Sequence, residues 1–367
     1  MNVRGSQFDE NHGTHFAFGF VYSGGFQIEA EVTQTGMMRV NVGFEPSSFQ
    51  WTLGPDESFA TPEVLLATSS KGVGEISRQL HRLTRTRLVR GHWRDLPRPV
   101  LINSWEAMYF AVTEDDIVTK LAEPAAKLGF DLVVVDDGWF GERGSDETSL
   151  GDWYVNKDKF PNGLKGVADR VNALGLQFGI WMGTYERTTG AQLLSQLLIE
   201  PEMISVHSDL YREHPDWALH VDGRPRSEGR HQLILDLSRP DVCQFVVDAV
   251  CGVLGSANIS YLKWDFNRSL TEVGSARLPA STQGEVHHRY VLGLYWCLER
   301  ITKAFPKVLL ESCSGGGGRY DYGILYYSPQ VWTSDNTDAI ARQRIQYGTS
   351  IAYPASTMSC HVSKVVQ

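Results

Sequence analysis

The stretch LVVVDDGW, residues Leu132–Trp139, decides the fold class of this chain. Its first four residues are apolar, and two aspartates follow them directly. A continuous apolar run of this length is typical of a strand buried on both faces, as in a parallel sheet covered by helices. Comparable runs recur along the chain at Val100–Trp105, Phe178–Met182, Gln232–Ser238, Tyr261–Asp265, Val308–Cys313 and Val331–Asp335.

Segments of helical length and pattern lie between these runs. They are Asp115–Leu128, Gly163–Leu174, Pro240–Leu254, Val286–Phe305 and Ala339–Tyr353. Strands that alternate with helices indicate an α/β protein with a parallel sheet. The seven units, with Ser356–Ser363 as a candidate for an eighth, predict a (β/α)8 TIM barrel over residues 97–367. We expect this barrel to be incomplete at its C-terminal end, without its final helix.

The polar residues favour a barrel over an open sheet. Each apolar run ends in groups suited to chemistry: Trp105-Glu106, Asp136-Asp137-Trp139, Trp181, Asp236, Lys263-Trp264-Asp265, Glu311-Cys313 and Asp335. Barrel enzymes build their sites from the C-terminal ends of many strands. A doubly wound sheet would concentrate such groups at one switch point.

The first 96 residues have a different texture. Short alternating runs at Phe18–Tyr22, Phe26–Thr33 and Met38–Gly43 predict antiparallel strands, and we interpret them as part of a β-sandwich. A helical stretch, Val73–Val89, then leads to the prolines at Pro97 and Pro99. We therefore place the domain boundary near residue 97.

Composition narrows the class of protein. The net charge is −9 and no Lys/Arg-rich run occurs, which argues against nucleic acid or an anionic membrane as a partner. No run of 18 apolar residues occurs, so the sequence predicts no membrane span. The five cysteines are odd in number, and their spacing matches neither a zinc site nor a redox pair.

Two aspartates at strand ends could carry catalysis. Asp265 lies between Lys263 and Arg268, and two such cations should keep a carboxylate ionised at neutral pH. Asp335 ends the next strand but one. Two carboxylates at nearby strand ends can approach within roughly 5–5.5 Å, the spacing of retaining glycoside hydrolysis. One would attack the anomeric carbon while the other protonates the leaving oxygen.

The Asp136–Asp137 pair allows three interpretations. Gly138 follows it, so the pair could simply end a strand in a turn. The carboxylates could instead accept hydrogen bonds from sugar hydroxyls, or bind a divalent metal ion. No histidine or further aspartate stands at ligand spacing to support a metal. The glycine run 315–318 lacks the ending of a P-loop, and it would let the backbone approach a flat ligand closely.

Four motifs together resemble one family. They are VVVDDGWF, KWDFNR, ESCSGGGGR and WTSDNTDA, in that order. With RPVLINSWEA, EPEMIS and HQLILDLSRP between or before them, the chain is similar from about Arg4 to about Ser363 to glycoside hydrolase family 36, the microbial α-galactosidases of clan D. The resemblance implies a retaining α-galactosidase that hydrolyses terminal α-galactosyl residues of melibiose- or raffinose-type oligosaccharides. It also implies no cofactor, no metal and a homotetramer.

The resemblance assigns roles residue by residue. Asp265 in KWD would be the nucleophile, and Asp335 in SDNTD the acid/base. The positions that would line the galactose pocket are Asp136, Asp137, Trp181, Arg230, Lys263, Cys313 and Gly316.

The chain departs from the family at three places. The family's N-terminal sandwich is longer, and the family continues beyond Ser363 with the last barrel helix and a C-terminal sandwich. In addition, 17 residues, Gly183–Ile199, stand where the family joins FGIW to EPEM through one residue. This insertion could be a translated short intron or a genuine loop. We expect the chain as written to be unstable or inactive, which leaves a catalytically defective sugar-binding fragment, or a related transglycosylase, as alternatives.

Overall fold

A parallel sheet forms the body of the computed structural model, which describes residues 9–145, 147–150, 152, 154–182 and 200–362. The strands of this sheet in the described residues are β5 (Leu101–Asn103), β6 (Leu132–Val135), β7 (Gln177–Trp181), β10 (Tyr261–Trp264), β11 (Leu309–Ser312), β12 (Gln330–Trp332) and β13 (Met358–Ser359). They are ordered β5-β6-β7-β10-β11-β12-β13, and each neighbouring pair is parallel. This arrangement confirms a TIM-type barrel that is incomplete in the described part of the chain.

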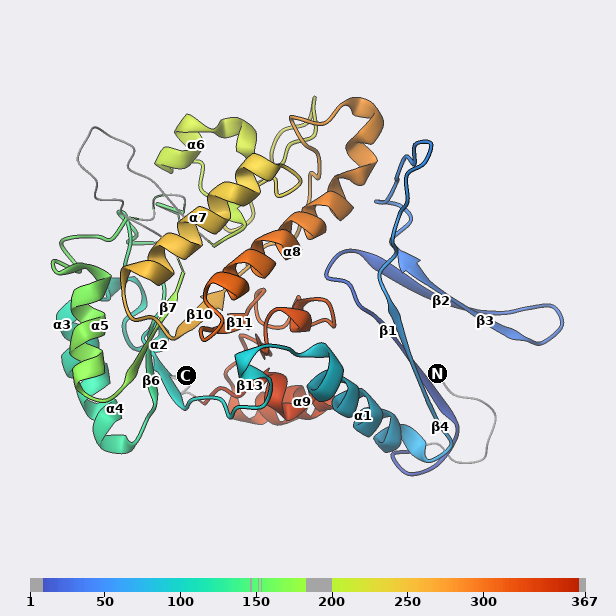
Figure 1. Ribbon diagram of the computed structural model, residues 1–367, viewed down its shortest axis with the longest axis horizontal. Coiled ribbons are helices and arrows are strands. Elements are labelled where there is room, and N and C mark those ends of the chain that lie inside the picture. Colours follow the sequence, from blue (N-terminus) through green and yellow to red (C-terminus); the bar gives the residue numbers. More distant parts are fainter. Residues whose placement is uncertain (1–8, 146, 151, 153, 183–199, 363–367) are drawn as a thin grey trace.

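Helices cover the outside of the sheet, as predicted (Figure 1). Their bounds are α3 (Glu114–Asp116), α4 (Glu123–Leu128), α5 (Gly163–Ala173), α7 (Pro240–Ser256), α8 (Val286–Ala304) and α9 (Ala339–Ser350). A π-helical segment, Ile117–Ala122, joins α3 to α4, so the predicted helix Asp115–Leu128 is one continuous helical run. The long helices α7 and α8 lie side by side and carry many of the buried apolar residues.

One predicted barrel strand is wrong. The run Gln232–Ser238 forms β9 (Leu233–Ile234), which pairs antiparallel with β8 (Met203–Ile204) outside the barrel sheet. Strand β7 pairs directly with β10 instead. The apolar run correctly predicted burial, since Leu233, Ile234 and Leu235 are buried. It did not predict the partner strand, because an apolar run indicates burial in any sheet. Within the described residues the seventh sheet strand is β13, from the segment predicted as a candidate eighth.

Alternation along the strands separates two cores. Leu132, Val134, Tyr261 and Leu309 pack together inside the barrel. The residues between them, such as Val133 and Val135 on β6, belong to the larger core under the helices. Successive side chains of a strand point to opposite faces, so the inward positions of each strand are fixed by this parity.

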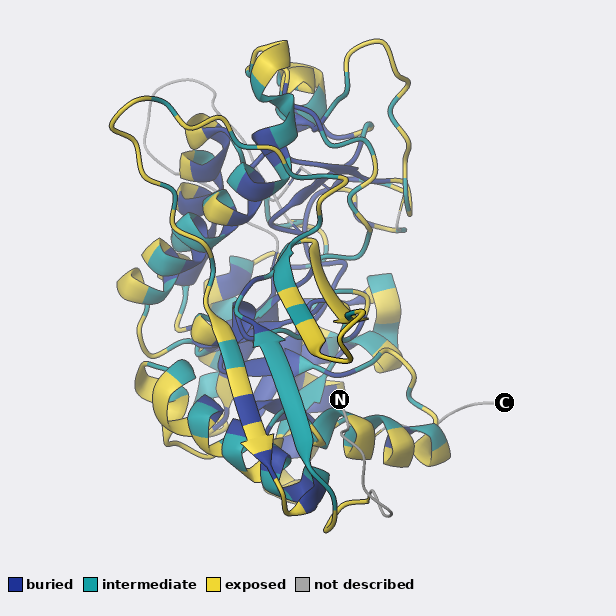
Figure 2. Ribbon diagram, turned by 90° about the vertical axis from the view of Figure 1, so that its right-hand side faces the viewer, coloured by how far each residue is buried: buried dark blue, intermediate teal, exposed yellow. Residues whose placement is uncertain are grey.

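The N-terminal part consists of antiparallel pairs. Strand β1 (His15–Phe20) pairs with β4 (Val64–Ser69), which the sequence did not predict, and β2 (Phe26–Val32) pairs with β3 (Met38–Phe44). The buried residues gather in the barrel, whereas most of the N-terminal strand residues are exposed or partly exposed (Figure 2). Antiparallel strands were expected here, and the sheets confirm them.

An aromatic cluster attaches this N-terminal part to helix α8. The ring of His288 on α8 lies 4.9 Å from the Phe44 ring centroid, 5.3 Å from that of Phe59 and 5.5 Å from that of Trp51. The Tyr22 hydroxyl lies 3.0 Å from His288 Nδ1. Burial lowers the pKa of His288 to about 4. The imidazole therefore stays neutral at physiological pH, which suits an apolar contact.

Two predictions fall outside what the structure tests. The predicted insertion, Gly183–Ile199, lies outside the described residues, and the boundary near residue 97 stays a prediction. In the described part of the chain no helix is long and apolar enough to cross a membrane.

Candidate active site

A cavity of about 460 Å³ lies at the C-terminal end of the parallel strands. Because side chains alternate between the two faces of a strand, only every second residue of each strand points into the barrel and can reach this cavity. Asp136 has the parity of Val134, Lys263 and Asp265 have that of Tyr261, and Glu311 has that of Leu309. The same rule places Asn103 of β5 and Trp181 of β7 in the lining.

Asp265 lies buried at the end of β10, with 7% of its surface exposed. The Trp181 Nε1–H donates to Asp265 Oδ2 at 3.3 Å, and the Phe266 backbone N–H donates to Oδ1 at 2.9 Å. Arg268, which the sequence suggested as a second neighbouring cation, instead donates to the carbonyl oxygens of Ser227 and Gln232. The carboxylate is therefore oriented mainly by two neutral N–H donors.

Asp335 follows β12 and is exposed, in contrast to Asp265. The Trp332 Nε1–H donates to Asp335 Oδ1 at 2.8 Å. Gly316 supports the same loop, because its φ is +88° and a Cβ there would lie 2.8 Å from the Asp335 backbone nitrogen. One carboxylate is thus enclosed and the other stands at the mouth of the same cavity.

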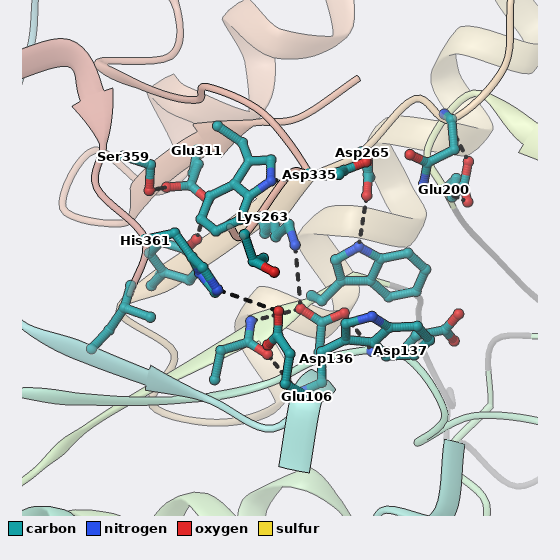
Figure 3. A pocket seen from close by; sticks show the side chains of 18 of the residues that line it. Glu106, Asp136, Asp137, Glu200, Lys263, Asp265, Glu311, Asp335, Ser359 and His361 are labelled. Carbon is teal, nitrogen blue, oxygen red and sulfur yellow. Dashed lines mark hydrogen bonds and ion pairs between the residues drawn. The ribbon is translucent and has the colours of Figure 1, made fainter. Parts of the chain in front are cut away.

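Cations and an amide hold the Asp136–Asp137 pair, and Figure 3 shows the ion pair of Lys263 with Asp136. The Asn103 Nδ2–H donates to Asp136 Oδ2 at 2.6 Å, and Lys263 Nζ lies 3.4 Å from the same oxygen. Burial opposes the charge on Lys263, but Asp136 and the other acidic neighbours hold the pKa of Lys263 well above its usual value. Arg143 binds Asp137 through two nitrogens, at 2.9 and 2.7 Å. Burial raises the pKa of Asp137, and the guanidinium of Arg143 opposes this shift.

These contacts weigh against a metal at the pair. Lys263 and Arg143 already supply the positive charge that a divalent ion would provide. Within the described residues no group of three or more His, Cys, Asp or Glu side chains is arranged to hold a metal ion.

The structure brings most of the predicted site residues together. Those that line the cavity are Asp136, Asp137, Trp181, Arg230, Lys263, Asp265 and Asp335. Cys313 and Gly316 are not among the lining residues, although Gly316 packs against the backbone of Asp335. The Cys313 thiol is buried, and burial with the nearby Asp265 raises the pKa of Cys313 well above its usual value. Asp236, at the end of the mispredicted strand, is not among the lining residues and accepts hydrogen bonds from Ser238 and Ser275.

Arg230 reaches the cavity from a tight turn. Gly229 and Gln232 exchange backbone hydrogen bonds of 3.2 Å, so Arg230 and His231 occupy the two central turn positions. Both have positive φ, 54° and 58°. This geometry costs free energy for residues with side chains and needs support from surrounding contacts.

Several lining residues were not predicted as site residues. They include Asn103, Glu106, Arg143, Glu200, Glu311, Trp332 and His361. Asn103 and Glu311 occupy inward positions of β5 and β11, so strand alternation could have found them, whereas Glu106 lies in the short helix α2 (Trp105–Met108) that follows β5. Arg143, Glu200 and His361 come from loops, whose position no sequence pattern defined. His361 Nε2 lies 3.4 Å from Glu106 Oε1. This contact joins the segments that follow β13 and β5, the two edge strands of the described sheet.

A (β/α) barrel with an enclosed and an exposed aspartate facing one polar cavity has the architecture of a glycoside hydrolase. Comparison with known families agrees. The sequence model described as Melibiase matches residues 58–367, and that of the Glycosyl hydrolase family 36 N-terminal domain matches residues 1–54. The chain belongs to the melibiase family, glycoside hydrolase family 36, which confirms the resemblance seen in its motifs.

Relatives with assigned names are similar along nearly the whole chain. Alpha-galactosidase AgaA from Geobacillus stearothermophilus is 55% identical over 97% of this chain and 46% of its own length. Alpha-galactosidase Mel36A from Lactobacillus acidophilus is 46% identical over the same shares. The crystal structure of AgaA superposes with a TM-score of 0.91 and covers 98% of this chain and 47% of that one. The chain therefore spans about half the length of the curated relatives that it matches.

Proposed function

We propose that this protein is a retaining α-galactosidase acting on melibiose- or raffinose-type oligosaccharides. The observation that carries the proposal is the pair Asp265 and Asp335, which line one cavity from strands β10 and β12 with opposite exposure. The relatives add support. AgaA and Mel36A are named α-galactosidases, and variants of AgaA have been crystallised with raffinose and with stachyose.

Each aspartate suits a different half of the reaction. The enclosed Asp265 attacks the anomeric carbon of the galactosyl residue and forms a covalent intermediate. Asp335, at the mouth where the leaving sugar departs, gives its proton to the glycosidic oxygen. It then removes a proton from the water that releases galactose. The expected carboxylate separation of roughly 5–5.5 Å stays a prediction of this mechanism.

The remaining lining residues suit a galactose ring. Asp136, Lys263, Asp137 and Arg230 offer charged hydrogen-bonding groups to its hydroxyls. The indole of Trp181 offers a flat apolar face beside Asp265. Gly316 packs against the backbone of Asp335 and so supports the loop that carries the acid. No step of this mechanism requires a cofactor or a metal ion.

Hydrolysis of p-nitrophenyl α-galactoside by the whole chain tests the proposal. Asp265→Ala should reduce kcat by several orders of magnitude, since the covalent route supplies several kcal/mol of the barrier reduction. Asp169→Ala, an exposed aspartate on α5 that pairs with Lys165, should act like the parent protein. Azide added to Asp265→Gly should yield β-galactosyl azide. If NMR shows that the parent protein first releases β-galactose from the α-galactoside, the reaction inverts and Asp265 is not a nucleophile.

One observation favours a second function. In the described residues β5 and β13 are both edge strands, so the barrel sheet is open between them. Such a protein could bind galactosides without turning them over. Measurable binding of raffinose by calorimetry, together with no hydrolysis, would favour this alternative. The homotetramer implied by the family resemblance is likewise a proposal, and light scattering would measure it.

A further inference from the structure

Glu200 lies in the cavity wall and accepts hydrogen bonds from three donors. The Asn267 backbone N–H donates to Oε2 at 3.2 Å, and the Asn267 side-chain N–H donates to Oε1 at 3.1 Å. The Gln232 side-chain N–H donates to Oε1 at 3.0 Å. Glu200 is 2% exposed, so these donors replace water as its partners. A carboxylate, which only accepts, fits a site made of N–H donors.

The donors belong to the loops that carry the reacting groups. Asn267 stands two residues after Asp265. Gln232 closes the turn that presents Arg230 in its positive-φ conformation. Asn267 also accepts the Gly315 backbone N–H at 3.1 Å, which extends the network into the glycine loop beside Asp335. Glu200 is thus bonded directly to two active-site loops and, through Asn267, to a third.

We infer that Glu200 is a positioning residue of the site: its carboxylate fixes Asp265 and Arg230 by holding Asn267 and Gln232 in place. The inference rests on the proposed galactosidase function for its kinetic consequences. Its structural consequence, ordered loops around Asn267 and Gly315, does not depend on that function.

The charges around Glu200 make the positioning sensitive to pH. Burial and the charge of Asp265 raise the pKa of Glu200 to about 7, while the Asn267 hydrogen bond and the guanidinium groups of Arg230 and Arg143 oppose the rise. Above this pH the carboxylate accepts all three N–H groups. Below it the side chain takes up a proton and resembles a glutamine. The protein and a Glu200→Gln variant should therefore differ most at alkaline pH.

The test compares Glu200→Gln with the parent protein from pH 5.5 to 8.5, using p-nitrophenyl α-galactoside. We expect kcat/KM of the variant to fall about ten- to a hundredfold at pH 8.5, which corresponds to about 1.4–2.7 kcal/mol. The deficit should shrink to a few-fold at pH 5.5. Glu228→Gln removes an exposed carboxylate from the same segment and should stay within twofold of the parent at every pH.

Amide hydrogen exchange supplies a second readout that needs no activity. Exchange at Asn267 and Gly315 should accelerate in Glu200→Gln, and Glu200→Asp gives the same measurement if the glutamine variant does not fold. A deficit equal at all pH values, or unchanged exchange at both amides, would overturn the inference. If the parent protein does not hydrolyse the substrate, the proposed function fails, while exchange still decides the role of Glu200.

Discussion

Replacing Arg143 by methionine should destabilise the protein strongly, because it leaves the Asp137 carboxylate buried without its cation. The side chains of Arg143 and Asp137 are only 2% and 9% exposed. The change removes three hydrogen bonds to Asp137, at 2.9, 3.2 and 2.7 Å, and one to the Thr148 carbonyl oxygen at 2.7 Å. Breaking one partner of a buried ion pair costs about 3–5 kcal/mol.

The cost should depend on pH in a defined direction. Burial already raises the pKa of Asp137, and loss of the opposing guanidinium would raise it further. A carboxyl whose folded pKa lies above its unfolded value destabilises the folded state above that folded pKa, and the penalty disappears as the group becomes protonated. The difference between parent and variant should therefore narrow as the pH falls from 7 toward 5.

Urea denaturation followed by tryptophan fluorescence measures this effect. Arg78→Met is the matched control, because Arg78 and Glu75 form an exposed pair whose loss costs at most about 1 kcal/mol. Adding Asp137→Asn to Arg143→Met should restore part of the lost stability by removing the unpaired charge. If Arg143→Met costs no more than Arg78→Met at pH 7, the buried pair does not support this loop.

Three further changes test other parts of the structure. Asp335→Ala should lower kcat/KM, which reports the first chemical step, far more for raffinose than for p-nitrophenyl α-galactoside, since a poor leaving group depends most on the acid. Equal losses in kcat/KM would reject that role. Burial raises the pKa of Asp321 to about 6. The contribution of Asp321 to the free energy of unfolding should therefore decline as the pH rises from about 4 through 6. Asp321→Asn should flatten that part of the curve of stability against pH. Helix propensity alone favours Gly293→Ala by about 1 kcal/mol, but the added Cβ would lie 1.9 Å from the Leu237 oxygen. Thermal unfolding should therefore show a net loss of stability, and a gain would contradict the packing of α8 against the residues that precede α7.

The sequence predicted the barrel because its signal is local. Runs such as Leu132–Val135 and Tyr261–Trp264 carry both their burial and the polar group at their end, so strand and site residue come together. The same signal failed at Gln232–Ser238, because an apolar run records burial and not the partner strand. It also missed β4 (Val64–Ser69), because the sequence VLLATS does not alternate apolar with polar residues, although the burial of the strand alternates.

The site was predictable only where a strand supplies it. Asp136, Lys263 and Asp265 follow from strand ends and parity. Arg143 comes from an irregular loop that is placed by its contact with the nearby Asp137, and Glu200 from a loop that is placed by a long-range contact with Asn267. Such contacts join residues far apart in the chain or in irregular segments, and no periodicity marks them.

The direct pairing of β7 with β10 has an evolutionary consequence. Residues 200–260, which the structure describes between these strands, add no strand to the barrel sheet. They nevertheless supply Glu200 and Arg230 to the cavity wall. This segment can therefore vary between homologues and change the part of the cavity wall that Glu200 and Arg230 form, while the hydrogen bonds of the parallel sheet stay the same.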